Sequence, residues 1–106
     1  MTAMFSRVPK VALKLFVAGA TPSAERAKSA LSAVCEQIRA RDPACRVDLE
    51  VHDVLDDPDA AVLNNVFATP TVIRVTPGPT RRLFGDLSSP EMVMIGLQLA
   101  AEPVSA

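Results

Sequence analysis

Residues 65–91 read NVFATPTVIRVTPGPTRRLFGDLSSPE and hold four of the nine prolines in this 106-residue chain. Pro70 stands directly before residues 71–75, an apolar run typical of a buried strand. A proline cannot donate a hydrogen bond to a sheet ladder, so its place at the mouth of a strand needs an explanation. Two explanations are open. One is a cis Thr69–Pro70 bond that turns the chain sharply into the strand, at a cost of only about 0.5–1 kcal/mol over trans. The other is an ordinary trans proline at a strand start.

A turn and a second strand follow this run. The turn consists of Pro77, Gly78 and Pro79. Residues 80–84 continue as a strand, and the tight turn predicts that the two strands are antiparallel. Ser88 and Glu91 then have the spacing of a capping box, which predicts the start of a last helix.

The first half of the chain predicts a strand, a long helix, a second strand and a short helix. Residues 11–18 alternate between two mostly apolar faces, as in a central strand. Pro22 opens an amphipathic helix of about 18 residues at the 3.6-residue period, which ends near Asp42. Residues 47–52 alternate apolar and polar side chains like a strand with one wet face. Residues 58–65 predict the short helix.

The complete order of elements is therefore βαβαββα, which is the order of the thioredoxin-like fold in the α/β class. The strand–helix–strand unit predicts that the first two strands are parallel. A chain of 106 residues has the usual size of a single domain. We expect that domain over residues 11–101, flanked by flexible segments at 1–10 and 102–106.

Composition and charge exclude several classes of protein. Hydrophobic residues make up 49% of the chain and charged residues 22%, as in a globular domain, and the formal net charge of −1 argues against nucleic-acid binding. No apolar run reaches the roughly 18 residues of a membrane span, so no membrane partner is expected. The two cysteines, Cys35 and Cys45, do not form a disulfide framework, which indicates a reducing cytoplasm.

The residues that would make this frame an enzyme are missing. A thioredoxin-like oxidoreductase needs a low-pKa thiolate at the start of its first helix, where this chain reads GATPS at 19–23. Cys35 lies on the apolar face of that helix, and we interpret it as a small buried hydrophobe. His52 stands alone on a polar strand face, and the acids Asp56, Asp57 and Asp59 lack the ligand pattern of a calcium loop. We therefore expect no catalytic residue, no metal and no cofactor, and predict a binding protein.

Three arginines form a predicted basic cluster on the strands around the turn: Arg74, Arg81 and Arg82. Alternation puts Arg81 and Arg82 on opposite faces, so at least one of them is predicted to be within reach of a partner carboxylate. The alternative is a charged edge strand that resists aggregation.

Four stretches of the chain match a known pattern: LKLFVAGATPSAERA, VHDVLDDP, ATPTVIRVTPGPTRRLFGDLS and MVMIGL. Together they cover about residues 12–99, and they resemble the KaiB family of bacterial circadian clock proteins. The resemblance implies a non-enzymatic regulator that binds the N-terminal ATPase ring of the clock kinase KaiC and modulates its phosphorylation and ATPase cycle. In cyanobacteria the bound form also captures KaiA. A related thioredoxin-like domain is the sensor of the clock-output kinase SasA, which is a far longer protein.

The resemblance also implies a change of fold. The thioredoxin-like form is the one that binds KaiC, whereas a resting form, often tetrameric, has the order βαββααβ. The last segment is consistent with two folds, because Gly96 inside a helix costs about 1 kcal/mol against alanine and residues 97–99 alternate as in a strand. We hypothesise that residues 53–99 exchange helix and strand, with a homodimer or homotetramer at rest. The alternative is one stable thioredoxin-like fold.

Two sets of residues follow from the resemblance by position. The partner-surface or surface-shaping residues are Arg26, Arg74, Arg81, Arg82, Gly85 and Asp86. The residues expected to affect the balance between folds are Pro70, Pro77, Gly78, Pro79, Gly96 and Gln98. Gly85 and Asp86 have an equally good local explanation as a turn and helix lead-in.

The chain also departs from the family pattern. Many members carry three prolines at 77–79, an acidic residue at Gln98, and basic residues at Glu50 and near Asn65. These departures favour a homologue from an organism with KaiC but no KaiA, so KaiA is the less favoured partner. Two other functions stay open. One is a thioredoxin-like adaptor or sensor for a histidine kinase or a stress response, and the other is a glutaredoxin-like oxidoreductase.

Overall fold

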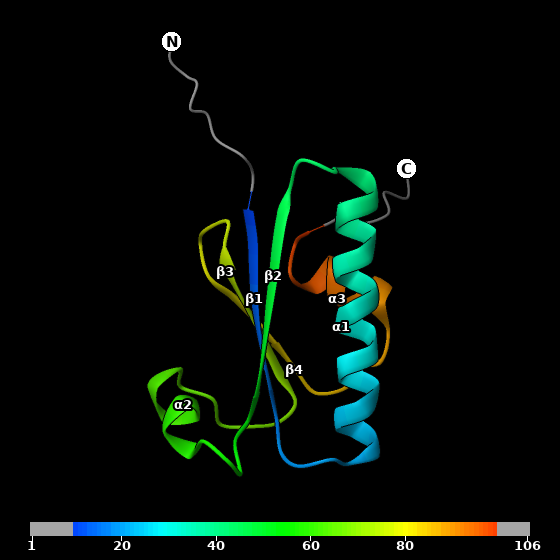
Figure 1. The fold of residues 1–106 in the computed structure, drawn as a ribbon. Helices are drawn as coiled ribbons and strands as arrows, with labels where there is room; N and C mark the ends of the chain where they lie inside the picture. The colour runs from blue at the N-terminus through cyan, green and yellow to red at the C-terminus, as the bar shows by residue number, and fades with distance from the viewer. Residues whose placement is uncertain (1–9, 100–106) are drawn as a thin grey trace.

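The computed structural model describes residues 10–99, and their elements have the predicted βαβαββα order (Figure 1). The strands are β1 (Lys10–Val17), β2 (Arg46–Asp53), β3 (Thr71–Thr76) and β4 (Arg81–Phe84). The helices are α1 (Pro22–Arg41), α2 (Pro58–Leu63) and α3 (Pro90–Gly96). The thioredoxin-like fold predicted from the sequence is confirmed.

The four strands form one sheet in the order β2-β1-β3-β4. β1 pairs with β2 in parallel and with β3 antiparallel, and β3 pairs antiparallel with β4. The parallel pair follows from the connection through α1, because such a crossover returns the chain to the same end of the sheet. β1 therefore lies inside the sheet, which explains its two apolar faces.

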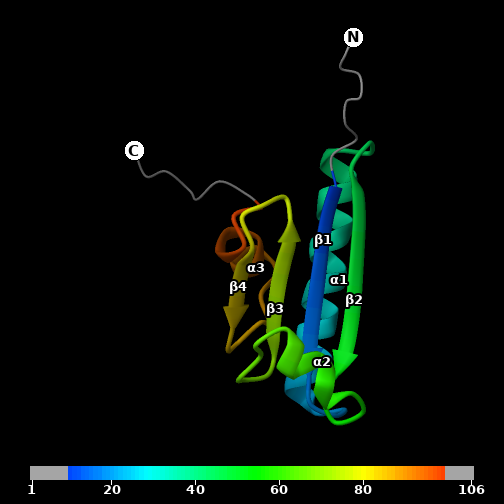
Figure 2. The ribbon, with the colours of Figure 1, turned by 90° about the vertical axis from the view of Figure 1, so that its left-hand side faces the viewer.

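The helices cover the two faces of the sheet unequally. α1 and α3 lie on one face, whereas α2 lies at one end of the opposite face (Figures 1 and 2). The hydrophobic core lies under α1 and α3, and its fully buried members are Leu13, Leu15, Val17, Leu31, Val34, Val72, Val93 and Leu97. The sheet thus has one face buried under two helices and another that is only partly covered.

Phe16 and His52 lie on the partly covered face. The Phe16 ring is fully buried, and the imidazole of His52 stacks on it with 4.9 Å between ring centroids. His52 is half-buried and makes a 3.0 Å contact through Nε2 with Oε1 of Glu50. His52 is therefore less exposed than its place on a polar strand face indicates, because the neighbouring strand supplies an aromatic ring at the same register position.

α1 begins where the sequence predicts. The hydroxyl oxygen of Thr21 accepts a hydrogen bond from the amide of Ala24 at 3.0 Å, and Pro22 occupies the first turn. Side chains at three- and four-residue steps face the sheet and are buried: Ala24, Ala27, Leu31, Val34, Cys35 and Ile38. The amphipathic period therefore predicts which side of this helix faces the sheet, and the residues at its two ends predict its extent.

The peptide bond between Thr69 and Pro70 is cis, as are Thr76–Pro77 and Gly78–Pro79. Of the two explanations for Pro70, the structure has the cis one. Pro70 itself is buried at the start of β3, and its carbonyl oxygen accepts a hydrogen bond from the amide of Gly85 at 3.3 Å. This bond continues the β3–β4 pairing past the end of β4.

α3 starts one residue later than the capping pattern indicates. Its N-cap is Ser89, whose hydroxyl oxygen accepts a hydrogen bond from the amide of Met92 at 3.3 Å. The hydroxyl of Ser88, the predicted cap, instead donates to Oδ1 of Asp86 at 2.6 Å. The predicted capping box of Ser88 and Glu91 was wrong because Asp86 takes the Ser88 side chain for the preceding turn.

The predicted domain boundaries can be compared with the structure only at the N-terminal end. Lys10 is already the first residue of β1 rather than part of a flexible segment. The rest of the predicted flexible segments, 1–9 and 102–106, lies outside the described residues, and the domain boundary at residue 101 stays a prediction. Within residues 10–99, no helix is long and apolar enough to cross a membrane.

A substitution at Gly85 tests the backbone of the β4–α3 turn. Gly85 has a φ of 105°, and a Cβ placed there would meet no atom within 4 Å, so Gly85→Ala changes backbone strain without a clash. We expect the free energy of unfolding to fall by about 1–2 kcal/mol. Gly78→Ala, which has the same open space without a positive φ, should change it by less than about 0.5 kcal/mol. Urea unfolding of both variants measures this, and equal stabilities would contradict it.

Candidate interaction surface

The place where thioredoxin-like enzymes hold their thiol is a small cavity without sulfur. It has a volume of about 160 Å³ between the start of α1 and the Pro70 loop, and it is lined by Val17, Ala18, Thr21, Ser23, Ala24, Thr69 and Pro70. None of these residues can act as a redox centre or a nucleophilic thiolate.

The two cysteines lie elsewhere. Cys35 is buried against the sheet, and burial raises the pKa of its thiol above the ordinary value, which outweighs the opposing effect of the Arg39 charge. Cys45 is half-buried in the loop before β2, and its thiol lies 3.6 Å from the carbonyl oxygen of Arg46. The interpretation of Cys35 as a buried hydrophobe is confirmed.

The most exposed apolar side chains gather around α2. We call this the α2 surface, and it consists of Leu55, Val62, Leu63, Phe67 and Phe84. Leu63 is 81% exposed and Phe67 is 92% exposed, and α2 itself buries no residue at all. Clustered apolar exposure of this kind marks an interaction site in a soluble domain.

A groove runs along one side of the α2 surface. It has a volume of about 340 Å³ and is lined by Asn65, Val66, Phe67, Ala68, Thr71, Arg82 and Phe84. Two exposed aromatic rings and one arginine therefore border the same hollow. Aromatic and arginine side chains dominate the energetics of protein interfaces.

Sequence reasoning placed the short helix correctly but missed the α2 surface. The signal was present in Val62, Leu63, Val66 and Phe67, a run of apolar residues at the end of a helix too short to bury them. Nothing in the sequence shows, however, that no neighbouring element covers these side chains.

The three predicted cluster arginines separate into different environments. Arg81 pairs in register with Arg74, and Arg82 pairs with Ile73, so Arg81 and Arg82 do lie on opposite faces as predicted. Arg82 is exposed and donates from Nη2 to the carbonyl oxygen of Asn64 at 2.6 Å and from Nη1 to that of Asn65 at 3.3 Å. Arg81 is half-buried on the side of α3.

Arg74 is a correction to the predicted surface cluster, because it is only 5% exposed. Its guanidinium donates to the carbonyl oxygen of Pro79 at 2.7 Å and to that of Gln98 at 3.4 Å, and within residues 10–99 its Nε has no partner. Its donors therefore point at the chain's own backbone. Arg74 was expected either to contact a partner or to shape the partner surface, and these contacts fit the second role.

Arg26, Gly85 and Asp86 meet at the start of α1 and the turn before α3. The amide and hydroxyl of Ser88 both donate to Asp86 Oδ1, at 3.0 and 2.6 Å. These hydrogen bonds lower the pKa of Asp86, and the charge of Arg26 lowers it further. This group is a turn held by local hydrogen bonds beside an exposed arginine, and its partner role stays a prediction.

The residues predicted to affect the balance between folds gather around the end of α3, apart from Pro70. Pro77, Gly78 and Pro79 form the exposed β3–β4 turn, which Arg74 ties to the carbonyl of Gln98. Gln98 has a left-handed φ of 56°. A Cβ on Gly96 would lie 2.9 Å from Cδ2 of Leu83, so this glycine lets α3 approach β4 closely. Their effect on fold balance stays a prediction.

Asp53 is a structural carboxylate that sequence reasoning did not identify. Its Oδ1 accepts hydrogen bonds from the amides of Gly19 and Leu55, each at 3.0 Å. The Gly19 bond, followed by the Leu55 bond, lowers the pKa of Asp53. Asp53 thereby joins the β1–α1 loop to the segment that leads into α2.

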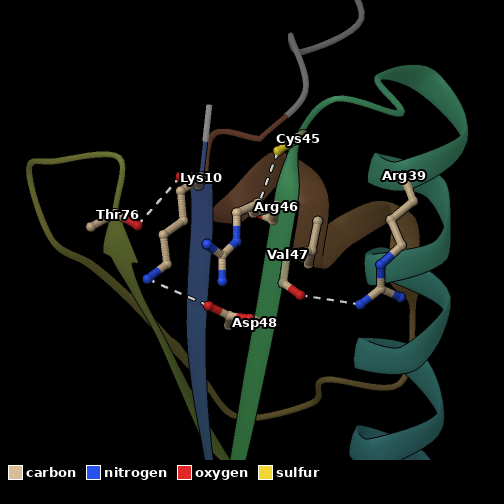
Figure 3. A network of polar contacts seen from close by, with 7 residues as sticks. All are labelled: Lys10, Arg39, Cys45, Arg46, Val47, Asp48 and Thr76. Atoms are coloured by element: carbon tan, nitrogen blue, oxygen red, sulfur yellow. Dashed lines mark hydrogen bonds and ion pairs between the residues drawn. The ribbon is translucent and has the colours of Figure 1, made fainter. Parts of the chain in front are cut away.

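A polar network fixes the other end of the sheet (Figure 3). Nζ of Lys10 lies 3.4 Å from Oδ2 of Asp48, the hydroxyl of Thr76 donates to the carbonyl oxygen of Lys10 at 3.3 Å, and Nη2 of Arg39 donates to that of Val47 at 3.1 Å. Exposed pairs of this kind contribute about 0–1 kcal/mol each. Among residues 10–99, no group of three or more His, Cys, Asp or Glu side chains could hold a metal ion.

The element order, the sheet and the start of α1 define a protein of the thioredoxin-like class. The chain belongs to the KaiB family, since the model of the KaiB domain matches residues 14–99. It is 44% identical over 92 residues to the circadian clock oscillator protein KaiB of Thermosynechococcus vestitus, covering 87% of this chain and 82% of that one. It is 43% identical over 93 residues to KaiB of Nostoc punctiforme, covering 88% and 86%.

Solved structures confirm the fold. The N-terminal domain of SasA from Synechococcus elongatus superposes with a TM-score of 0.67 at 20% identity, covering 93% of each chain. Thioredoxin from Fasciola hepatica superposes with a TM-score of 0.64 at 19% identity, covering 85% of this chain and 80% of that one. At these identities the likeness concerns the fold alone.

The pKa of Asp53 and Asp86 predicts acid sensitivity. Both folded-state values lie below the ordinary 3.8. The stability that these carboxylates contribute is therefore present above about pH 4 and is lost as the pH falls through the lowered values. Asp53→Asn should flatten the decline of unfolding free energy below about pH 4 in urea titrations. Parallel declines for the variant and the parent would contradict this assignment.

Thiol accessibility provides a second test. Cys45 should react with an aromatic disulfide reagent in the folded protein. Cys35 should react on the order of a hundredfold more slowly, because the Cys35 thiol is buried and its pKa is raised. Cys45→Ser should remove the fast phase and Cys35→Ser should keep it. Catalytic thiol–disulfide turnover that disappears in Cys35→Ser would instead identify an oxidoreductase.

Proposed function

We propose that this protein is a non-enzymatic clock regulator that binds the N-terminal ATPase ring of a KaiC-type kinase and modulates its phosphorylation and ATPase cycle. The observation that carries the proposal is the α2 surface. Its helix buries none of its residues and exposes the side chains of Val62 and Leu63 to solvent. A partner that covers these side chains would remove their apolar area from water. The family membership and the clock names of the relatives support KaiC as that partner.

We further propose that the thioredoxin-like conformer is the binding-competent one and exchanges with a βαββααβ ground state over residues 53–99. The elements of this region are short: α2 has six residues, β4 four and α3 seven. If the ground state dominates, the apparent affinity for KaiC falls by the competent fraction. A homo-oligomer at rest, a cytoplasmic location and KaiA as a less favoured partner belong to the same proposal.

A thioredoxin-like adaptor or sensor for a histidine kinase is the second candidate. It follows from the resemblance to the SasA sensor, with which the chain shares its fold. Light scattering coupled to size-exclusion chromatography, with KaiC and ATP and separately with a histidine kinase, distinguishes the two. Co-elution with KaiC supports the clock proposal, and its absence under all nucleotide states together with kinase co-elution supports the adaptor.

Substitutions on the α2 surface test the docking site. Leu63→Ser and Val62→Ser together should weaken KaiC binding about 30-fold or more, as expected for an interface hot spot. Because both side chains are exposed, the unfolding free energy should change by less than about 0.5 kcal/mol. Met92→Ser is the matched control, since Met92 is 61% exposed but lies on α3. Equal affinities for the double variant and the control, measured by biolayer interferometry, would remove the α2 surface from the proposal.

A further inference from the structure

The position of α2 is not explained by hydrophobic packing. The helix has six residues and buries none of them, although a short helix is usually held by its apolar face. Its N-cap bond, from the amide of Ala60 to Oδ1 of Asp57, is local. The amides of Asn64 and Val66 likewise donate to carbonyl oxygens in the same segment, Ala60 and Ala61. These bonds shape the helix, and the 3.0 Å bond from the amide of Asp57 to the carbonyl oxygen of Asp53 joins only its start to the end of β2.

Arg82 attaches the other end of α2. From β4 its guanidinium reaches across to the end of α2, with 2.6 Å from Nη2 to the carbonyl oxygen of Asn64 and 3.3 Å from Nη1 to that of Asn65. Within residues 10–99, every other hydrogen bond of segment 57–68 joins residues no more than five positions apart. The Arg82 contacts span 17 and 18 positions.

One of the two carbonyls that Arg82 binds is left without an amide donor by the end of the helix. It belongs to Asn64, the C-cap of α2, and the other belongs to Asn65, which follows with a left-handed φ of 56°. A planar guanidinium can bind both at once. The contacts use only backbone oxygens just past the end of α2, so they leave the side chains of Val62 and Leu63 free for a partner.

We infer that Arg82 is the positioning residue of the α2 surface: it fixes the end of α2 to β4 and so sets the groove between Phe67 and Phe84. This inference rests on the proposed function for the identity of the partner. It assigns Arg82 the role of positioning α2 for the partner rather than contacting the partner directly. Arg82 itself lines the groove. Arg81, its neighbour on the opposite face, makes no contact of this kind within the described residues.

The same arrangement recurs at the end of α3. Gln98 follows the C-cap Leu97 and has a φ of 56°, and its carbonyl oxygen accepts from the guanidinium of Arg74 on β3. Each of the two short helices thus ends at a left-handed non-glycine residue whose carbonyl is bound by an arginine of the β3–β4 hairpin. The recurrence supports the interpretation that these arginine contacts hold the ends of short helices in place.

Amide hydrogen exchange measured by NMR on the resonances of the thioredoxin-like conformer tests the inference directly. In Arg82→Ala, the amides of Asn64, Asn65 and Val66 should exchange roughly tenfold faster, while those of β1 stay unchanged. Arg82→Lys, which keeps the charge but offers a single donor group, should restore part of the protection. Arg81→Ala is the matched control and should leave exchange in this segment unaltered. Unchanged exchange in Arg82→Ala overturns the inference.

KaiC binding provides the second readout. If Arg82 positions the docking helix, Arg82→Ala should weaken binding roughly tenfold, mainly through faster dissociation, and Arg82→Lys should recover part of the loss. Faster exchange in Arg82→Ala with unchanged KaiC affinity overturns the positioning role for docking. If the parent protein fails to bind KaiC, the proposed function fails while the exchange result still decides whether Arg82 holds α2.

Discussion

Burial of one face of the sheet beneath α1 is the interaction on which the rest of the structure depends. β1 lies inside the sheet and sends Leu13, Leu15 and Val17 under the helix, where Leu31 and Val34 meet them with essentially no exposure. Complete burial of a Leu or Val side chain stabilises a fold by about 1.5–3 kcal/mol, so this layer holds the frame together. On the opposite face, the buried apolar residues of the described strands are only Phe16 and Ile73. That imbalance is what leaves α2 outside the core.

Two arginines of the β3–β4 hairpin add hydrogen bonds to the hydrophobic packing of the core. Arg74 and Arg82 both bind backbone carbonyls, yet they lie on opposite faces and in opposite environments, one buried and one exposed. A buried guanidinium needs hydrogen-bond partners to offset its desolvation, and Arg74 finds them in Pro79 and Gln98. The hairpin thereby contacts the ends of both short helices, α2 outside the core and α3 inside it.

Local signals in the sequence predicted the fold well. The period of α1, Pro22 in its first turn and the apolar run of β3 depend on neighbours a few residues away, and each is found as expected. Ser88 was misassigned because Asp86 competes for the same hydroxyl, and Arg74 because alternation gives a face and not a depth. The α2 surface could not be predicted, because the exposure of its side chains depends on whether another element of the fold covers the helix, and the sequence does not show this.

The division between the two halves of the chain bears on the proposed exchange of folds. Residues 10–53 supply β1, α1 and β2, which form a parallel strand–helix–strand unit with its own buried layer. Between residue 54 and residue 99, the buried members of the core cluster are Val72, Leu87, Val93, Met94 and Leu97. An alternative arrangement of this second half would have to rebury five side chains while the first half keeps its packing. Besides this packing, the segments after α2 and α3 would lose their hydrogen bonds to Arg82 and Arg74, and the buried contact of Arg74 costs about 1–3 kcal/mol when broken. A difference of this size between two arrangements can be reversed by the free energy of binding one partner.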